Sequence, residues 1–275
     1  MNRLFKGRRI RYGHLLAGLV LLGLLALLLS GCSADTPENT FNPAGDVART
    51  QRNLFLAAMW PAIGVMILVE GLIVVMLIRF RRREGDRIPK QTHGNMPLEI
   101  TWTIIPAIML LILGVPMVIA IFDVGREPSA DAYPIKVQGE RFQWTFEYPK
   151  ILGKDGSAIT TYNGELHIPA GREIGLTMTS IDVIHSFAVP RLAGTRDVIP
   201  GQEERMWIKA DDPGSLAGQC REFCGLDHAL MKIRVIVQSQ EDFDAWGKEM
   251  SAGVRSAPDE SGQADAVAAA RATGE

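Results

Sequence analysis

The sequence predicts a membrane-anchored all-β protein, in which a two-helix transmembrane hairpin is followed by a domain of short strands. Three observations support this fold class. Two long apolar stretches occur in the first half of the chain, and many short segments rich in Val, Ile, Phe, Trp and Thr follow them. The mean hydropathy of +0.09, with 22% charged residues in a chain of 275, is typical of apolar blocks attached to a polar domain.

The composition also excludes several classes of protein. A formal net charge of -2 excludes the chain-wide basic character of a nucleic-acid-binding protein, so no nucleic acid is expected as a partner. Three cysteines are too few for a disulfide-rich secreted framework, and five histidines are too few for a histidine-rich catalytic core. No Cys-x-x-Cys-His motif occurs, so the chain is not expected to carry a c-type haem.

The first apolar stretch, residues 15–29, is uncharged and follows a basic segment without acidic residues. This pattern is typical of a secretory signal peptide, which we place at residues 1–31. It ends at Gly31-Cys32, which resembles the bacterial lipobox, where the cysteine is lipidated and becomes the mature N-terminus. The alternative is a plain first membrane helix with an incidental cysteine. Membrane lipid is therefore an expected partner, and residues 32–53 an external N-terminal segment.

The transmembrane hairpin is predicted at residues 54–122. Its two spans, 54–78 and 101–122, are long and apolar enough to cross a bilayer. The loop 79–98 is rich in arginine, so the positive-inside rule places it in the cytoplasm and the rest of the chain outside a bacterial plasma membrane. Glu70 lies inside the first span. A hydrogen-bonded carboxyl at a helix contact and a role in proton traffic are both open interpretations.

Residues 123–250 are predicted to form the external domain, as a β-sandwich or barrel. Turns rich in Gly and Pro separate its candidate strands, which argues against a parallel α/β sheet. A short helix is expected at Glu241–Met250, and residues 251–275, rich in Ala, Ser and Gly, are expected to be a disordered tail. The candidate strands are Ile135–Val137, Phe142–Tyr148, Glu173–Ser180, Ser186–Val189, Glu204–Ile208 and Ile233–Val237.

Cysteine, histidine and methionine gather in one short stretch of this domain. Cys220, Cys224, His228 and Met231 follow one another at intervals of four, four and three residues, and His185 stands 35 positions before the first. Thiolate, imidazole and thioether are soft or borderline donors that favour copper, and a blue-copper site uses one Cys, two His and a distant Met. Here a second cysteine is added. Because two thiolates can bridge two metal ions, the pattern predicts a dinuclear copper centre.

The cysteines allow two other interpretations. Cys220 and Cys224 could form a disulfide on the oxidising side of the membrane, which would leave His185, His228 and Met231 unexplained. A Cys2His2 zinc site is the second alternative, but zinc has little use for a methionine and zinc-finger spacings differ. A lone histidine is usually structural, so no role is assigned to the remaining histidines, His14, His93 and His167.

Residues 92–250 resemble cytochrome c oxidase subunit II, in its bacterial lipoprotein form. Three segments carry the resemblance: LEITWTIIP at 98–106, DVIHSFAVP at 182–190 and GQCREFCGLDHALM at 218–231. The resemblance implies a cupredoxin-like Greek-key β-barrel that holds two copper ions in a copper A centre. The implied ligands are the side chains of His185, Cys220, Cys224, His228 and Met231 and the backbone carbonyl of Glu222.

The resemblance also implies roles for two carboxylates. The side chain of Glu222 would reach a magnesium ion shared with subunit I. Glu99 matches the family's glutamate at the mouth of the proton path called K, where a carboxylate takes protons from the cytoplasm. The alternative for Glu99 is a solvated helix-start residue that the helix dipole favours.

One departure from the family concerns electron entry. Family members often have Trp-Tyr-Trp where this chain has Phe142-Gln143-Trp144. Phe142 would occupy the electron-entry position, and Trp144 keeps the third place. The phenyl ring is smaller and lacks an indole N–H, so its contact with a donor differs from that of the family. Simple strand packing is the alternative for both aromatic residues.

The resemblance implies an electron-entry subunit of a respiratory oxidase. Cytochrome c or a similar soluble donor would supply electrons, which pass to the haem-copper subunit I for reduction of oxygen coupled to proton pumping. No oxygen chemistry lies in this chain. From Asp123 onward acidic residues outnumber basic ones, which suits a basic donor.

Several alternative functions share parts of this pattern. A quinol oxidase subunit shares the fold but lacks the copper ligands, and a nitrous-oxide reductase needs a large histidine-rich domain. Two further alternatives remain. One is a membrane-anchored copper protein that takes electrons from another donor, such as a blue copper protein. The other is a copper carrier or assembly protein.

Overall fold

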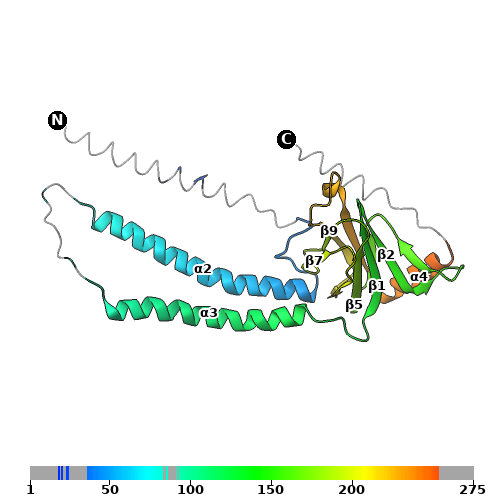
Figure 1. Ribbon diagram of the computed structural model, residues 1–275, viewed down its shortest axis with the longest axis horizontal. Coiled ribbons are helices and arrows are strands. Elements are labelled where there is room, and N and C mark those ends of the chain that lie inside the picture. The colour runs from blue at the N-terminus through cyan, green and yellow to red at the C-terminus, as the bar shows by residue number, and fades with distance from the viewer. Residues whose placement is uncertain are drawn as a thin grey trace. The chain divides into compact units, whose positions relative to one another are not determined.

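The computed structural model describes residues 36–82, 85, 91 and 93–253, together with positions 18, 20, 23 and 24. Cys32 with its predicted lipidation, nearly all of the predicted signal peptide, and the predicted tail from residue 254 onward lie outside the described residues. Within them, two long apolar helices precede a domain of ten strands and a short C-terminal helix (Figure 1). The predicted fold class, two apolar helices followed by an all-β domain, is confirmed.

The two long helices are α2 (Asp46–Arg79) and α3 (Met96–Val124), and both are long and apolar enough to cross a membrane. Each contains its predicted span and begins several residues earlier. Helix α3 begins early because the Asn95 side chain caps it, accepting a hydrogen bond from the Leu98 N–H, and because Pro97 suits a first helical turn. Hydropathy alone does not detect such polar helix starts.

The start of α2 is fixed by contacts with loops of the β domain. The backbone N–H of Ala44 donates to the carbonyl of Arg191 at 2.6 Å. Arg49 forms an ion pair with Asp211. Gly45 lies so close to the backbone of the loop that contains Asp211 that a Cβ at residue 45 would clash with the carbonyl of Lys209. These contacts explain why the helix extends over the polar residues that precede its apolar part.

The β domain is formed by two five-stranded sheets. Their strand orders are β3-β2-β1-β5-β8 and β4-β10-β9-β6-β7. The pairs β1·β5 and β4·β10 are parallel, and the other neighbours are antiparallel. The strands are β1 Tyr133–Glu140, β2 Gln143–Leu152, β3 Ala158–Thr161, β4 Glu165–Pro169, β5 Ile174–Ser180, β6 His185–Ala188, β7 Thr195–Val198, β8 Glu204–Ile208, β9 Gly214–Cys220 and β10 Lys232–Gln238.

Alternate residues of these strands form the hydrophobic core. In β1, Ile135 and Val137 are buried, and in β2, Trp144 and Phe146 are fully buried. This period of two is what a strand with one buried face requires. Phe187 of β6 packs edge-to-face on the rings of Trp144 and Phe146 in β2, at centroid distances of 5.6 and 6.4 Å, and thereby joins the two sheets.

Helix α4 (Gln240–Ser251) covers one part of this core and confirms the short helix predicted at Glu241–Met250. Its Trp246 stacks on the ring of His167 at 4.3 Å. Both ring nitrogens of His167 are hydrogen-bonded, to Gln238 and Glu165. This histidine, to which the sequence assigned no role, therefore packs as part of the structure.

The six predicted strands are all present, with small shifts at their ends. Four further strands, β3, β4, β7 and β9, were not predicted. Strands β3 and β7 have only four residues each. Strand β9 is rich in glycine, and its Gly218 lies so close to β6 that a Cβ would clash with the carbonyl of Ala188. Strand β9 has no Val, Ile or Thr, the β-branched residues by which strands are predicted, and glycine is unfavourable in strands in general.

We expect Gly164→Ala to destabilise the domain more than its control, Gly171→Ala. Both glycines have positive φ, +80° and +71°, which costs an alanine about 1–2 kcal/mol. A Cβ at residue 164 would also clash with the Lys232 carbonyl, whereas at residue 171 it meets nothing within 4 Å. Unfolding of the detergent-solubilised chain in denaturant should show a loss of about 3 kcal/mol or more for Gly164→Ala. Equal losses in the two variants would contradict the importance of the close contact.

Candidate metal centre

The predicted metal-binding residues come from strand ends and one loop of the second sheet. His185 is the first residue of β6, Cys220 is the last residue of β9, and the β9–β10 loop carries the others. Strands β6 and β9 pair with Phe187 opposite Cys220, and the Arg221 N–H donates to the Ser186 carbonyl at 2.9 Å. This pairing brings together residues that lie 35 positions apart in the sequence.

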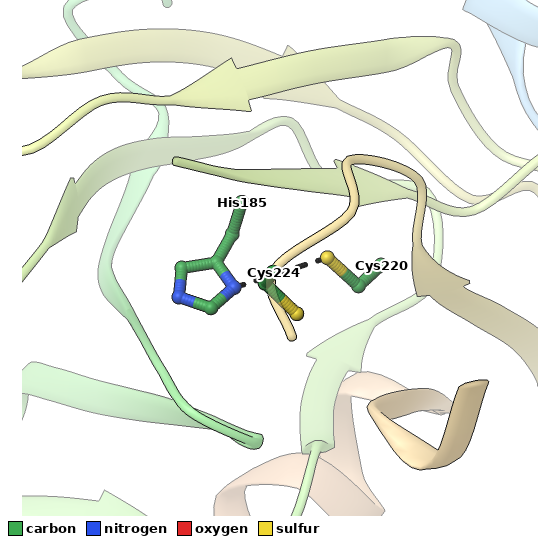
Figure 2. Close-up of side chains that lie close together, drawn as sticks. All are labelled: His185, Cys220 and Cys224. Carbon is green, nitrogen blue, oxygen red and sulfur yellow. Dashed lines mark hydrogen bonds between the residues drawn. The ribbon is translucent and has the colours of Figure 1, made fainter. Parts of the chain in front are cut away.

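One group of donor atoms surrounds the sulfur of Cys220. Its Sγ lies 3.9 Å from Nδ1 of His185 and 3.3 Å from the backbone oxygen of Glu222. Figure 2 shows the ring nitrogen of His185 directed at Cys220, with Cys224 beside them. The ligand atoms of the histidine and the two cysteines all lie within 4.8 Å of one another. Three side chains thus converge as the ligands of a metal ion would.

A second group surrounds the sulfur of Cys224. Its Sγ lies 3.5 Å from Nδ1 of His228 and 3.8 Å from Sδ of Met231. His228 begins the short 3-10 helix η1 (His228–Leu230), and Met231 follows it directly. Each cysteine therefore has its own histidine, and each group is completed by one weaker donor.

Most of these donors are shielded from water. His185 and Met231 are fully buried, and Cys220 and Cys224 are 3% and 4% exposed. Both cysteines are free thiols, so the disulfide alternative is not what the structure shows. Burial, and then the neighbouring Cys220, raise the pKa of the Cys224 thiol to about 11. A metal that binds its thiolate must therefore displace a proton.

Asp182 fixes the ring of His185. Its Oδ1 lies 2.9 Å from Nε2 of that ring. Because an ionised carboxylate only accepts, Nε2 carries the proton and Nδ1 keeps its lone pair on the side of Cys220. Burial alone would raise the pKa of Asp182, but hydrogen bonds from His185, from the Val183 N–H and from Arg141 outweigh burial and hold this pKa well below its usual range.

The imidazole of His185 also packs against the first sheet. The fully buried Trp144 meets it edge-to-face, at a centroid distance of 5.9 Å. A Cβ on Gly139 of β1 would lie only 3.1 Å from Cδ2 of the imidazole and 3.2 Å from Cζ3 of the indole. The absence of a side chain at residue 139 therefore leaves the space that the two rings occupy.

The two aromatic residues predicted for electron entry occupy different places. Trp144 lies beneath His185, inside the core. Phe142 is half-buried and packs against the ligand-bearing loop, because a Cβ on Gly225 would lie 3.0 Å from its ring. Both residues therefore adjoin the metal-binding residues, and their role in electron entry stays a prediction.

Glu99 lies apart from this cluster, in the first turn of α3. Its carboxylate accepts a hydrogen bond from the Asn95 N–H at 3.0 Å, close to the positive end of the helix dipole. Glu99 thus makes the helix-start contact that is the alternative to a role in a proton path. The proton-path role of Glu99 stays a prediction, as does magnesium binding by the exposed carboxylate of Glu222.

Comparison with known proteins places the chain in a family. The family model for the transmembrane domain of cytochrome c oxidase subunit II matches residues 40–119, and the model for its periplasmic domain matches residues 152–239. Cytochrome c oxidase subunit 2 of Alkalihalophilus pseudofirmus is 38% identical over 240 residues, which cover 85% of this chain and 68% of the relative. The chain belongs to the cytochrome c oxidase subunit II family. Members of this family are components of an oxidoreductase complex, and their cupredoxin-like periplasmic domain binds copper in a CuA centre.

Relatives within the family carry different names. Quinol oxidase subunit 2 of Bacillus cereus is 33% identical over 241 residues, which cover 86% of this chain and 79% of the relative. Among solved structures, the periplasmic domain of subunit II of cytochrome oxidase of Bradyrhizobium japonicum is 30% identical; the match covers 46% of this chain and 96% of that chain, with a TM-score of 0.42. Because both oxidase types match, the electron donor has to be argued from the site.

The sequence predicted which donor side chains lie together but not the residues that support them. Asp182, three residues before His185, could have been predicted as such a residue, because a carboxylate commonly accepts from the second ring nitrogen of a metal-binding histidine and orients it. No sequence signal marked Gly139, because its contact with the histidine ring is made between two sheets that only the fold brings together.

Proposed function

We propose that this chain is the electron-entry subunit of a respiratory cytochrome c oxidase, accepting electrons from cytochrome c and delivering them to the haem-copper subunit I. In that complex, oxygen is reduced to water and protons are pumped. The observation that carries the proposal is the division of the donors into two groups. Each group has one thiol and one imidazole, and the sulfurs of Cys220 and Cys224 stand next to each other.

The donor set fits a pair of copper ions. His185, Cys220 and the Glu222 carbonyl would hold one ion, and Cys224, His228 and Met231 the other, because the contacts of the two sulfurs divide the donors in this way. Soft sulfur donors favour copper over hard cations, and a thioether is of little use to zinc. When bound, the copper pair supplies one-electron redox chemistry. The exposed carboxylate of Glu222 offers the oxygen donors that magnesium prefers, which supports an interfacial magnesium shared with subunit I.

The protein's contribution is to hold the ligands in place. Asp182 fixes the tautomer and the orientation of His185, and Trp144 packs against the same ring. Ligands whose orientation is set by hydrogen bonds and packing move little when the charge of a site changes. Phe142, at the rim of the ligand loop, and Trp144 beneath it remain our candidates for electron entry.

The remaining assignments concern the membrane. We propose that α2 and α3 span a bacterial plasma membrane with the loop 79–98 in the cytoplasm and the domain 123–250 on the outer face. The charge of the loop and the two apolar helices support this topology. We also propose a signal peptide at 1–31, a lipid anchor at Cys32 and entry of protons at Glu99.

The alternatives account for less of the site. A quinol oxidase subunit does not need copper ligands, yet all six donors converge here. A copper carrier or assembly protein needs an exchangeable site, whereas two of these ligands, His185 and Met231, are fully buried. A membrane copper protein served by a blue copper donor shares the same site and differs only in its partner.

Copper loading of the full chain in detergent tests the proposal. We expect two copper ions per chain, and an EPR spectrum in which one unpaired electron is shared between two copper nuclei. Cys220→Ser should abolish this spectrum because it removes one of the two neighbouring sulfurs. His93→Ala, a change outside the site, should keep it. A single copper ion, or a single tetrahedral zinc ion, would overturn the proposal.

Copper affinity should rise with pH. The Cys224 thiol, with a pKa near 11, holds its proton at neutral pH and must lose it on binding. Each proton released strengthens apparent binding by about tenfold per pH unit, at every pH below that pKa. Competition with a chelator of known protonation behaviour, between about pH 6 and 8, measures this slope. Binding that does not change with pH would contradict a protonated thiol in the metal-free chain.

The geometry around Gly139 gives a spectroscopic prediction. We expect Gly139→Ala to shift the EPR hyperfine pattern and the visible spectrum of the copper-loaded chain, because the added methyl group must displace the ring of His185. The matched control is Gly175→Ala in β5. Its Cβ would come about as close, 3.0 Å, to Pro128, which is not a candidate copper ligand. Both variants should lose about 1–3 kcal/mol of stability through overpacking. A copper spectrum unchanged in Gly139→Ala would contradict the contact.

The acidic character of the outer domain predicts a salt effect. A basic cytochrome c should reduce the copper-loaded chain quickly at low ionic strength, and at least about tenfold more slowly in high salt, because screening weakens electrostatic steering. Stopped-flow absorbance measures the rate. A rate that is independent of salt would argue against a basic donor.

A further inference from the structure

A chain of hydrogen bonds connects the surface of the β domain with the buried ring of His185. Arg141 lies in the turn between β1 and β2, and its side chain is 50% exposed. Its Nε donates to Oδ2 of Asp182 at 3.1 Å, and its backbone N–H donates to the same oxygen at 2.9 Å. The other oxygen, Oδ1, accepts from Nε2 of His185 at 2.9 Å. The charge of Arg141 therefore reaches a candidate copper ligand through a single carboxylate.

The same arginine also lies against the loop that carries the second cysteine. A Cβ on Gly225, the residue after Cys224, would lie 3.6 Å from Cδ of Arg141. Arg141 belongs to the β1–β2 turn, Asp182 to the β5–β6 loop and Gly225 to the β9–β10 loop. One side chain thus meets two other segments that are distant in the sequence, at the rim of the candidate metal centre.

The carboxylate of Asp182 influences the electron density of the imidazole. Burial would raise the pKa of Asp182, but its hydrogen bonds outweigh burial and keep this pKa below its usual range, so the group is negatively charged at neutral pH. A carboxylate that accepts from the second ring nitrogen makes a metal-binding histidine more basic. A more basic ligand stabilises the oxidised, more positive state of a metal. A guanidinium on Oδ2 draws charge away from Oδ1 and therefore opposes this effect.

We propose that Arg141 is a positioning residue for electron transfer: it holds the carboxylate of Asp182 from the surface and thereby raises the reduction potential of the copper centre. The inference rests on the proposed function, because it concerns the copper ions that the site would hold. An exposed ion pair contributes little to stability by itself. Three other donors, the N–H groups of residues 141 and 183 and Nε2 of His185, keep Asp182 in place without the guanidinium. Loss of the arginine side chain should therefore change the potential and leave the fold intact.

A redox titration of the copper-loaded full chain in detergent, followed by visible absorbance, tests this proposal. Arg141→Met removes the charge and keeps most of the length of the side chain. At a fixed applied potential, the ratio of reduced to oxidised centre should fall at least about threefold, which corresponds to about 28 mV for a one-electron couple. Arg141→Lys keeps a cation and a donor beside Asp182, so it should show less than half of that shift.

The matched control is Arg205→Met. The side chain of Arg205 is 53% exposed and pairs with Glu203 and Glu127, so this variant loses the same charge and leaves the hydrogen bonds of Asp182 in place. It too should show less than half of the shift. Equal shifts in the two methionine variants, an unchanged ratio in Arg141→Met, or an equally large shift in Arg141→Lys would overturn the proposal. Loss of copper or of cooperative unfolding in Arg141→Met would overturn it as well.

NMR of the metal-free chain separates this proposal from the proposed function. With isotope-labelled histidine, the proton on Nε2 of His185 reports its hydrogen bond to Asp182 directly. In Arg141→Met this proton resonance should move to lower field, because the carboxylate accepts more strongly once the guanidinium is gone, and in Arg205→Met it should stay in place. A resonance that does not move in Arg141→Met would overturn the role of this arginine. Absence of the two-copper EPR spectrum in the unaltered chain would instead count against the proposed function.

Discussion

The pairing of β6 with β9 is the contact on which the candidate copper centre depends. It places the strand that begins at His185 beside the strand that ends at Cys220, with backbone hydrogen bonds that require no metal. Gly218 permits this, because a side chain there would clash with the carbonyl of Ala188. Zinc fingers, by contrast, remain unfolded until their metal binds. Here the pairing of two strands brings the imidazole of His185 close to the thiol of Cys220.

The same surroundings shift two neighbouring pKa values in opposite directions. The thiol of Cys224 is buried beside a second sulfur and receives little stabilisation for a negative charge, so its pKa rises to about 11. Asp182 is also partly buried, but it accepts hydrogen bonds from His185, Val183 and Arg141, so its pKa falls. Burial favours the neutral form unless donors compensate for lost water. The site therefore combines a fixed negative charge, which orients the histidine, with a thiol that ionises only when a cation replaces its proton.

How much of the molecule follows from the sequence depends on the range of the interactions involved. The apolar parts of α2 and α3 and the strands rich in branched and aromatic residues are local patterns, and they were predicted. The closeness of Cys220, Cys224, His228 and Met231 was predicted too, because they lie within one short stretch, and their role as copper ligands stays a prediction. Strand β9 was missed because it has no β-branched residue, and its Gly218 is needed for the close approach of β6. The contact of Gly139 with the imidazole was missed because it exists only between two sheets.

The polar start of α2 shows a further consequence of such long-range contacts. Val47 and Ala48 are buried, and the Ala48 N–H donates to the carbonyl of Leu192, in the loop that follows β6. The hydropathy of the sequence places the start of the membrane span at about residue 54 and does not predict the helical turns before it. In the structure, these turns tie the membrane helix to the loop directly after the strand that begins with His185. The segment that begins with His185, a candidate copper ligand, is thus directly followed by the loop that receives the membrane helix.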